Sequence, residues 1–321
     1  MSLLIYAESA EGKFKKVAFE LASYAKKVAE SLGTTVTAVT INAGDVSELA
    51  KYGVDKVLKV KNEALTGFSA KAYADIIKQA AKKEGAKVVV LSSTTDSIYL
   101  SSLVAVGLDA GFASNVVGLP VSTNPFQVKR TAFSNKAFTI TEITTDVKVL
   151  GLAKNSYGII ENNVSLTEED FNPTIDANDF SVKVTAVEKS SGKVSIADAD
   201  IVVSGGRGLK GPENWGMIEE LASVLGAATA CSKPVSDLGW RPHAEHVGQT
   251  GKPVATNLYI AIGISGAIQH IAGINSSKVK VVINNDPEAP FFKVADYGVV
   301  GDAFEIVPQL IEKLKAFKAQ H

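Results

Sequence analysis

Short β-branched runs alternate with amphipathic helical stretches in the first third of the chain, and this alternation narrows the possible folds. The strand candidates are Leu3–Ala7, Thr35–Ile41 and Val54–Val60. Between and after them, apolar residues recur at helical spacing in Phe14–Ser31 and Ala70–Glu84. Strands and helices that alternate in this way build a parallel sheet with helices on its faces. The pattern therefore predicts an α/β fold.

The pattern changes after Val88–Leu91, an apolar run that is typical of a strand buried on both faces. Turn signals separate the strand-like segments of residues 113–152, which predicts a short antiparallel addition. We expect Glu161–Asp179 to form a loop and Phe180–Glu188 to form one more strand. The segment Lys189–Lys193 contains Ser190, Ser191 and Gly192 and is the expected hinge and domain boundary.

A second α/β unit follows this boundary. Its strand candidates include Asp198–Ser204 and Leu258–Ile262, and its helix candidates include Trp215–Leu225 and Phe304–Ala319. A length of 321 residues suits two globular domains. We predict two Rossmann-like, doubly wound parallel-sheet domains, at residues 1–190 and 191–321.

Composition excludes several classes of protein. The 33 basic and 34 acidic residues give a net charge of −1, so there is no bulk electrostatic reason to bind nucleic acid or an anionic membrane. The single cysteine, Cys231, excludes a disulfide framework and a multi-cysteine metal site within this chain. The apolar runs fall far below the roughly 20 residues of a membrane span, and no targeting segment precedes the first strand candidate. We expect a soluble protein of the bacterial cytoplasm.

A glycine-rich turn follows the first strand of the second unit. Residues 206–211, Gly-Arg-Gly-Leu-Lys-Gly, match the G-x-G-x-x-G pattern, which fits a phosphate site or a plain structural turn. A nicotinamide site also expects an acidic residue after the next strand. That strand candidate, Ala227–Ala230, instead ends at Cys231-Ser232-Lys233, which argues against such a site. Arg207, between two glycines, is free to pair with a phosphate or a neighbouring subunit.

Two polar loops of the second unit gather donors that suit a cofactor. Gly263–His270 is a strand-to-helix turn that brings together backbone, hydroxyl, amide and imidazole groups. Val247–Lys252 is another glycine-bracketed loop, but its spacing is not that of a Walker motif. His243 and His246 lie near His270 in sequence, yet no recognisable metal-ligand spacing accompanies them. Since such loops lie at the carboxyl ends of strands, they suit a large uncharged ring system with a pyrophosphate. No catalytic triad or carboxylate pair indicates a hydrolase.

Several of these segments together resemble the alpha subunit of electron transfer flavoprotein. They are residues 204–208, 247–252, 258–261, 263–270 and 294–298, and the opening residues 3–8 look like the first strand of that family. The resemblance runs in order along the whole chain and is densest from Ser204 to Pro308. It implies that the C-terminal domain binds FAD and that the N-terminal domain serves subunit assembly without a cofactor of its own.

The resemblance also implies a set of FAD-contacting positions. They are Arg207, Ser232, Lys233, Val247, Gly248, Gln249, Thr250, Ser265, Gly266, Ala267, Ile268, Gln269, His270, Asn284 and Asp302. In the family, the Thr at position 250 approaches flavin N5, and the His at position 270 approaches the N1/C2 carbonyl side. Two positions depart from the family, which usually has Arg where Lys233 stands and often has Lys where Asn285 stands. Lys233 keeps the charge but loses the planar fork of donors.

The implied function is that of an electron carrier rather than a substrate-converting enzyme. Paired with a beta subunit, which holds AMP where AMP is present, it accepts electrons from acyl-CoA and related flavoprotein dehydrogenases. It then passes them to a quinone reductase of the respiratory chain. One alternative within the family is an electron-bifurcating variant that oxidises NADH. Alternatives outside it are an NAD-dependent dehydrogenase and a nucleotide-binding regulatory module.

Overall fold

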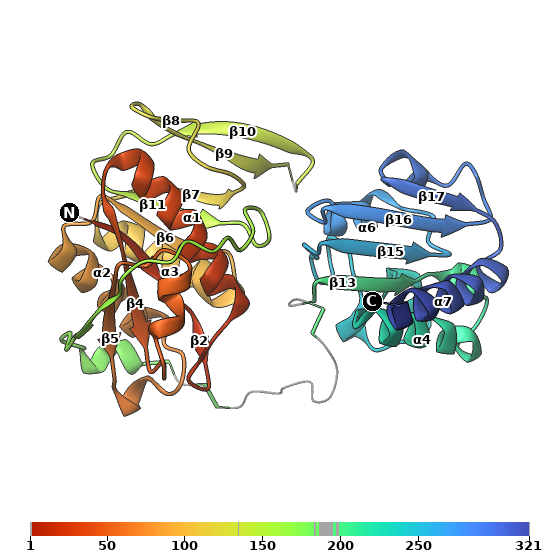
Figure 1. The fold of residues 1–321 in the computed structure, drawn as a ribbon, viewed down its shortest axis with the longest axis horizontal. Coiled ribbons are helices and arrows are strands. Elements are labelled where there is room, and N and C mark those ends of the chain that lie inside the picture. The colour runs from red at the N-terminus through yellow and green to blue at the C-terminus, as the bar shows by residue number, and fades with distance from the viewer. Residues whose placement is uncertain (1, 134, 183, 186–194, 197–198, 321) are drawn as a thin grey trace. The chain divides into compact units, whose positions relative to one another are not determined.

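The chain folds into two compact units, one built mostly from residues before Lys189 and the other mostly from residues after it (Figure 1). The computed structural model describes residues 2–133, 135–182, 184–185, 195–196 and 199–320. The hinge and domain boundary predicted at Lys189–Lys193 lie outside the described residues.

The N-terminal unit is built on a large, mainly parallel sheet with the strand order β10-β9-β7-β11-β6-β1-β4-β5-β12. Its strands are β1 (Ser2–Tyr6), β4 (Thr35–Ile41), β5 (Lys56–Val60), β6 (Val88–Ser92), β7 (Gly111–Val116), β8 (Ser122–Thr123), β9 (Phe126–Ala132), β10 (Ala137–Glu142), β11 (Lys148–Leu152) and β12 (Thr167–Asp170). A small hairpin, β2 (Ser9–Ala10) with β3 (Lys13–Phe14), follows β1.

Helices cover both faces of this sheet. They are α1 (Lys16–Leu32), α2 (Ala70–Glu84) and α3 (Thr95–Gly107). Successive residues of β1 point to opposite faces, so Leu3 packs with α1 in one core, whereas Leu4 packs with α2 and α3 in the other. The sheet is therefore buried on both sides, as its continuous apolar strands predict.

The antiparallel addition is smaller than residues 113–152 predict. Both β8 and β10 pair antiparallel with β9, which joins the sheet through an antiparallel pair with β7, whereas β11 lies between β6 and β7 and pairs parallel with both. Turn signals mark where a strand ends but do not indicate which strand the next one pairs with. The prediction that β11 belongs to the antiparallel addition is therefore wrong.

Two further predictions for the N-terminal unit are wrong. The expected loop Glu161–Asp179 contains β12, an edge strand that pairs parallel with β5. Its Thr-Glu-Glu-Asp sequence has no apolar alternation, and its acidic side chains instead form ion pairs, such as Glu169 with Lys56 at 2.8 Å. The described residues of the expected strand Phe180–Glu188 form no strand, because Phe180 ends a short 3-10 turn at Ala177–Phe180; positions 183 and 186–188 lie outside the described residues.

The C-terminal unit holds a five-stranded, fully parallel sheet with the order β14-β13-β15-β16-β17. Its elements are β13 (Ile201–Gly205), α4 (Gly216–Leu225), β14 (Ala228–Cys231), α5 (Lys233–Asp237), β15 (Leu258–Ile262), α6 (Ile268–Ile274), β16 (Val279–Asn284), β17 (Tyr297–Val300) and α7 (Ala303–Gln320). One core joins the sheet to α4 and α7, and another lies on the opposite face. Both units are thus α/β, with helices on either face of a parallel sheet (Figure 1).

Across the described parts of the chain, no helix combines the length and the apolar character needed to cross a bilayer.

Candidate cofactor site at the carboxyl edge of the C-terminal sheet

The carboxyl ends of the five parallel strands place the predicted site residues along one edge of the C-terminal sheet. Open α/β sheets bind ligands at this edge, next to the point where the strand order reverses. Here the reversal lies between β13 and β15, since β14 and β15 flank β13 on opposite sides. Residues that directly follow the strands, or end them, are Arg207 after β13, Ser232 and Lys233 after β14, Ser265–His270 after β15, Asn284 at the end of β16, and Asp302 after β17.

The glycines of the turn after β13 serve close packing between two loops. The N–H of Gly206 donates to the carbonyl of Ile262 at 2.9 Å, and the N–H of Gly208 donates to that of Gly263 at 3.1 Å. A Cβ on Gly206 would lie 2.1 Å from the carbonyl oxygen of Gly263. Gly263 itself has a φ of +62°, which favours glycine. This backbone contact explains why glycines stand at positions 206 and 208. Because α4 begins only at Gly216, the turn does not lead directly into an α-helix as a phosphate-binding loop does.

The loop at Val247–Thr250 joins this edge through its backbone. Val247 donates its N–H to the carbonyl of Cys231 at 3.0 Å, beside the end of β14, and Gln249 donates to the carbonyl of Gln269 at 2.7 Å. Gly248 lies against α6, because a Cβ on Gly273 would be 2.5 Å from the Gly248 Cα. The side chains of Gln249 and Thr250 remain exposed. The structure thus brings together two loops that are about 20 residues apart in sequence.

His270 lies in the core below this edge. Its Nε2 is 2.9 Å from the hydroxyl of Tyr259, and its ring also packs near Phe291. Among the described residues its Nδ1 has no hydrogen-bond partner. Burial lowers the pKa of His270 to about 4, and the nearby His246 contributes to the shift. The imidazole is therefore neutral at pH 7, and only one of its two nitrogens carries a proton to donate.

Two further histidines, His243 and His246, lie on the segment that leads to Val247. His243 Nδ1 is 3.1 Å from the Ser236 hydroxyl, and His246 is buried. Burial, with a smaller contribution from His243, lowers the pKa of His246. The part of the chain that the structure describes contains no group of three His, Cys, Asp or Glu side chains placed to hold a metal ion.

Two predicted contact residues are engaged within the protein. Asn284 donates from Nδ2 to the carbonyl of Ile264 at 3.1 Å and accepts the N–H of Asp286. Asp302 accepts the N–H of Phe304 at 2.9 Å and so caps the start of α7. These side chains hold the shape of their loops. Sequence reasoning missed Tyr259, since a tyrosine within an apolar strand has the appearance of an ordinary core residue.

Ser232 is buried, whereas the remaining polar side chains of the edge stand exposed. They are Arg207, Lys233, Gln249, Thr250, Ser265 and Gln269. No described residue forms an ion pair with Arg207 or Lys233. Two unpaired cations beside neutral hydroxyl and amide groups suit a ligand that has a phosphate part and an uncharged, polar ring.

Comparison with known proteins identifies the family. A profile of the electron transfer flavoprotein domain matches residues 3–179, and a profile of the electron transfer flavoprotein FAD-binding domain matches residues 195–275. The electron transfer flavoprotein subunit alpha of Thermoanaerobacterium thermosaccharolyticum is 36% identical, over 98% of this chain and 98% of its own length. That of Bacillus subtilis is 34% identical over 98% and 97%, and Protein FixB of Clostridium saccharobutylicum is 34% identical over 97% and 95%. The chain therefore belongs to the electron transfer flavoprotein alpha-subunit family, and the cofactor of its C-terminal domain is FAD.

Proposed function

We propose that this chain is the FAD-carrying alpha subunit of a heterodimeric electron carrier in the cytoplasm. It accepts electrons from acyl-CoA and related flavoprotein dehydrogenases, as in fatty acid β-oxidation, and passes them to a quinone reductase. The observation that carries the proposal is the open carboxyl edge of the C-terminal sheet, where Arg207 and Lys233, which have no ion-pair partner among the described residues, stand beside exposed neutral donors. An electron carrier needs a held and accessible cofactor but no substrate pocket with proton-transfer groups.

The side chains of this edge fit FAD. Arg207 and Lys233 supply positive charge for the diphosphate and for the flavin, and Gln249, Thr250 and Ser265 supply neutral hydrogen bonds to ring and ribose atoms. Buried His270 has one nitrogen, Nδ1, without a partner among the described residues. Buried polar atoms normally find a partner, and a ligand atom at this edge would be one for Nδ1, beside the backbone of Val247, which also interacts with this imidazole. FAD, when bound, supplies the reversible transfer of one or two electrons.

His270 and Lys233 contribute different interactions to the cofactor site. Since the pKa of His270 is held at about 4, its imidazole contributes a neutral hydrogen bond and no charge at pH 7. The positive charge that stabilises added electron density therefore comes from Lys233 and Arg207. Lys233 offers a rotatable point charge, whereas an Arg would offer a planar fork that can stack on a ring.

We further propose that the beta subunit covers the outer side of α3. Apolar residues lie on both the buried and the exposed side of this helix, which is typical of a helix that is buried in an assembly. Its exposed side chains include Ile98, Tyr99, Leu103 and Val106, with 78% of Val106 exposed. Exposed apolar side chains grouped on one element mark a site of protein association.

The first test is the visible absorption spectrum of this chain, copurified with its candidate beta subunit. We expect flavin bands that dithionite bleaches and that return in air, with one FAD released per alpha chain. A colourless complex that takes up no added FAD would contradict the proposal.

The second test separates the carrier from the electron-bifurcating alternative. An acyl-CoA dehydrogenase with its substrate is expected to bleach the flavin of the complex, whereas NADH alone is not. Bleaching by NADH without any dehydrogenase would favour the bifurcating variant and would contradict the simple carrier.

A further inference from the structure

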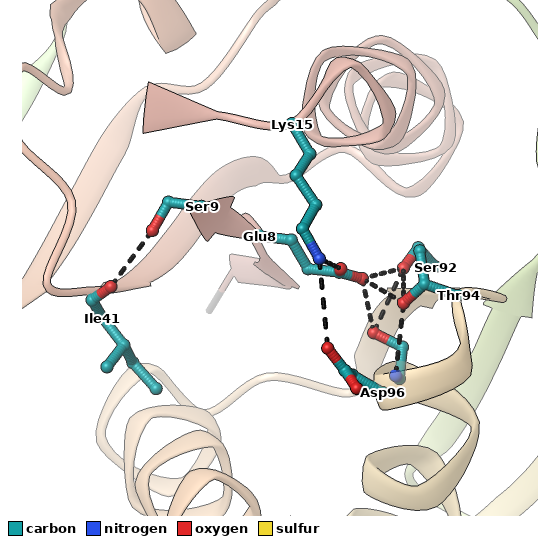
Figure 2. A network of polar contacts seen from close by, with 8 residues as sticks. Glu8, Ser9, Lys15, Ile41, Ser92, Thr94 and Asp96 are labelled. Carbon is teal, nitrogen blue, oxygen red and sulfur yellow. Dashed lines mark hydrogen bonds and ion pairs between the residues drawn. The ribbon is translucent and has the colours of Figure 1, made fainter. Parts of the chain in front are cut away.

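The N-terminal sheet has a reversal point of its own, and a buried carboxylate fills it. The chain leaves β1 for β4 on one side and later reaches β6 on the other, so the carboxyl ends of β1 and β6 flank the crevice where such sheets bind ligands. Glu8 stands two residues after β1 and is only 3% exposed. Figure 2 shows its carboxylate pointing at Ser92, the last residue of β6, and at Thr94, which follows that strand.

Four side-chain donors converge on Glu8. One carboxylate oxygen accepts hydrogen bonds from the hydroxyls of Ser92, of Thr94 at 2.7 Å and of Ser97 at 2.6 Å. The other accepts from Nζ of Lys15 at 3.1 Å. These donors come from three places in the chain, namely the end of β6, the first turn of α3 and the residue before α1.

This donor set is the one that a bound phosphate takes in other α/β proteins. Hydroxyl groups, a lysine and the start of a 13-residue helix all stabilise an anion. Thr94 also caps α3, because its hydroxyl accepts the N–H of Ser97 at 3.3 Å. Every one of these side-chain donors is already paired with a negative charge that belongs to the chain itself.

The negative charge of Asp96, next to Lys15, disfavours the binding of a further anion at this cluster. The carboxylate of Asp96 lies 4.0 Å from Nζ of Lys15, on the exposed side of the cluster (Figure 2). A phosphate that approached Lys15 would therefore meet two carboxylates, Glu8 and Asp96, around a single cation. Like charges at this spacing repel.

We infer that Glu8 is an internal anion, which takes the place of a bound phosphate at the reversal point and closes the N-terminal unit to nucleotides and free anions. Removal of the Glu8 side chain opens a buried space lined by three hydroxyls and a lysine. That space is a site for a small oxyanion, and inorganic phosphate serves as the probe. A change from Glu8 to Gln removes the charge but fills the same volume, so it creates no such site.

The test compares the full-length chain with its Glu8→Ala and Glu8→Gln variants in phosphate and in sodium chloride of equal ionic strength. Hydrogen exchange of the α3 amides reports on the N-terminal unit. Fluorescence of Trp215 and Trp240 reports on the C-terminal unit, which holds both tryptophans of the chain. We expect exchange in α3 to be faster in Glu8→Ala and to slow at least tenfold as phosphate saturates the site, with tryptophan fluorescence unchanged.

The controls make the inference falsifiable. The wild type and Glu8→Gln are expected to respond equally to phosphate and to chloride. Phosphate that slows exchange in the wild type as much as in Glu8→Ala would overturn the inference, and so would a Glu8→Ala variant with no response. If Glu8→Ala is insoluble, it is refolded from urea in each salt. Recovery in phosphate alone supports the inference, and equal failure in both salts overturns it.

Discussion

At the scale of single residues, the buried imidazole of His270 predicts how the C-terminal unit responds to acid. Its pKa is about 4 in the folded chain, against an ordinary value of 6.5, so the unfolded chain binds the proton more tightly. The free energy of unfolding therefore falls as the pH drops from about 6.5 to about 4 and levels off below that range. The total loss is roughly 3 kcal/mol, of which about 2 kcal/mol falls between pH 7 and pH 5.

Urea unfolding followed by tryptophan fluorescence at pH 7 and pH 5 measures this loss in the C-terminal unit. The matched variant is His270→Gln, which removes the titrating group and keeps a polar side chain. Its loss between the two pH values is expected to be clearly smaller than that of the wild type. An equal loss in both proteins would contradict the burial argument.

Tyr259 is the second residue whose role can be measured. Its hydroxyl is the partner of His270 Nε2, and its side chain is fully buried. A Tyr259→Phe change leaves that nitrogen unpaired, which costs about 1–3 kcal/mol of the free energy of unfolding. If His270 donates to FAD as proposed, the loss of this fixed orientation also shifts the reduction potential of the bound flavin. Tyr297→Phe, at an exposed tyrosine, is the control and is expected to change neither quantity.

At the scale of loops, the contact between the turns after β13 and β15 predicts opposite effects for two glycine changes. A Gly206→Ala change places Cβ 2.1 Å from the Gly263 carbonyl oxygen, and we expect it to cost about 1–3 kcal/mol and to weaken FAD binding. Gly216→Ala, in the first turn of α4, meets no atom within 4 Å and is expected to gain about 0.5 kcal/mol. Midpoints of urea unfolding check both values, and equal midpoints for the two variants would refute the packing argument.

Some elements are predictable from sequence because their local pattern matches their environment. α2 and β15 have the predicted bounds, Ala70–Glu84 and Leu258–Ile262, since each has a regular apolar pattern and clear ends. α3 has no apolar face to detect, because apolar residues surround it. β12 has no apolar residues at all and is held by pairing and ion pairs with β5, which are contacts distant in sequence.

The same distinction applies to the candidate site. That the loops after parallel strands gather polar groups follows from topology, so the edge itself is predictable. Which side chains of the edge face outward cannot be predicted from the sequence. Asn284 ends β16 and Asp302 follows β17, and the hydrogen bonds that each side chain makes within its own loop could not be predicted from sequence. His270 pairs inward with Tyr259, a contact that only the packing of α6 on β15 determines.

At the scale of the whole molecule, the outer side of α3 predicts how the subunits associate. A lysine at Val106 or Ile98 would place an unpaired charge in the proposed interface, and burying such a charge is costly. We expect Val106→Lys and Ile98→Lys each to weaken association with the beta subunit roughly tenfold or more. Phe317→Lys, at an exposed apolar position of α7, is the control. Titration of the beta subunit by calorimetry gives the dissociation constants, and an equal effect of all three changes would argue against α3.

The glycine contact between the turns after β13 and β15 has a consequence for protein engineering. Around these two turns the edge is shaped by main chain packed on main chain, and Gln249 is likewise held through its backbone N–H rather than its side chain. The backbone conformation of this edge therefore does not depend on the exposed side chains of Arg207, Lys233 and Gln249. A combinatorial library at these three positions should leave most members folded, and the flavin potential can then be selected over a range of values on one unchanged frame.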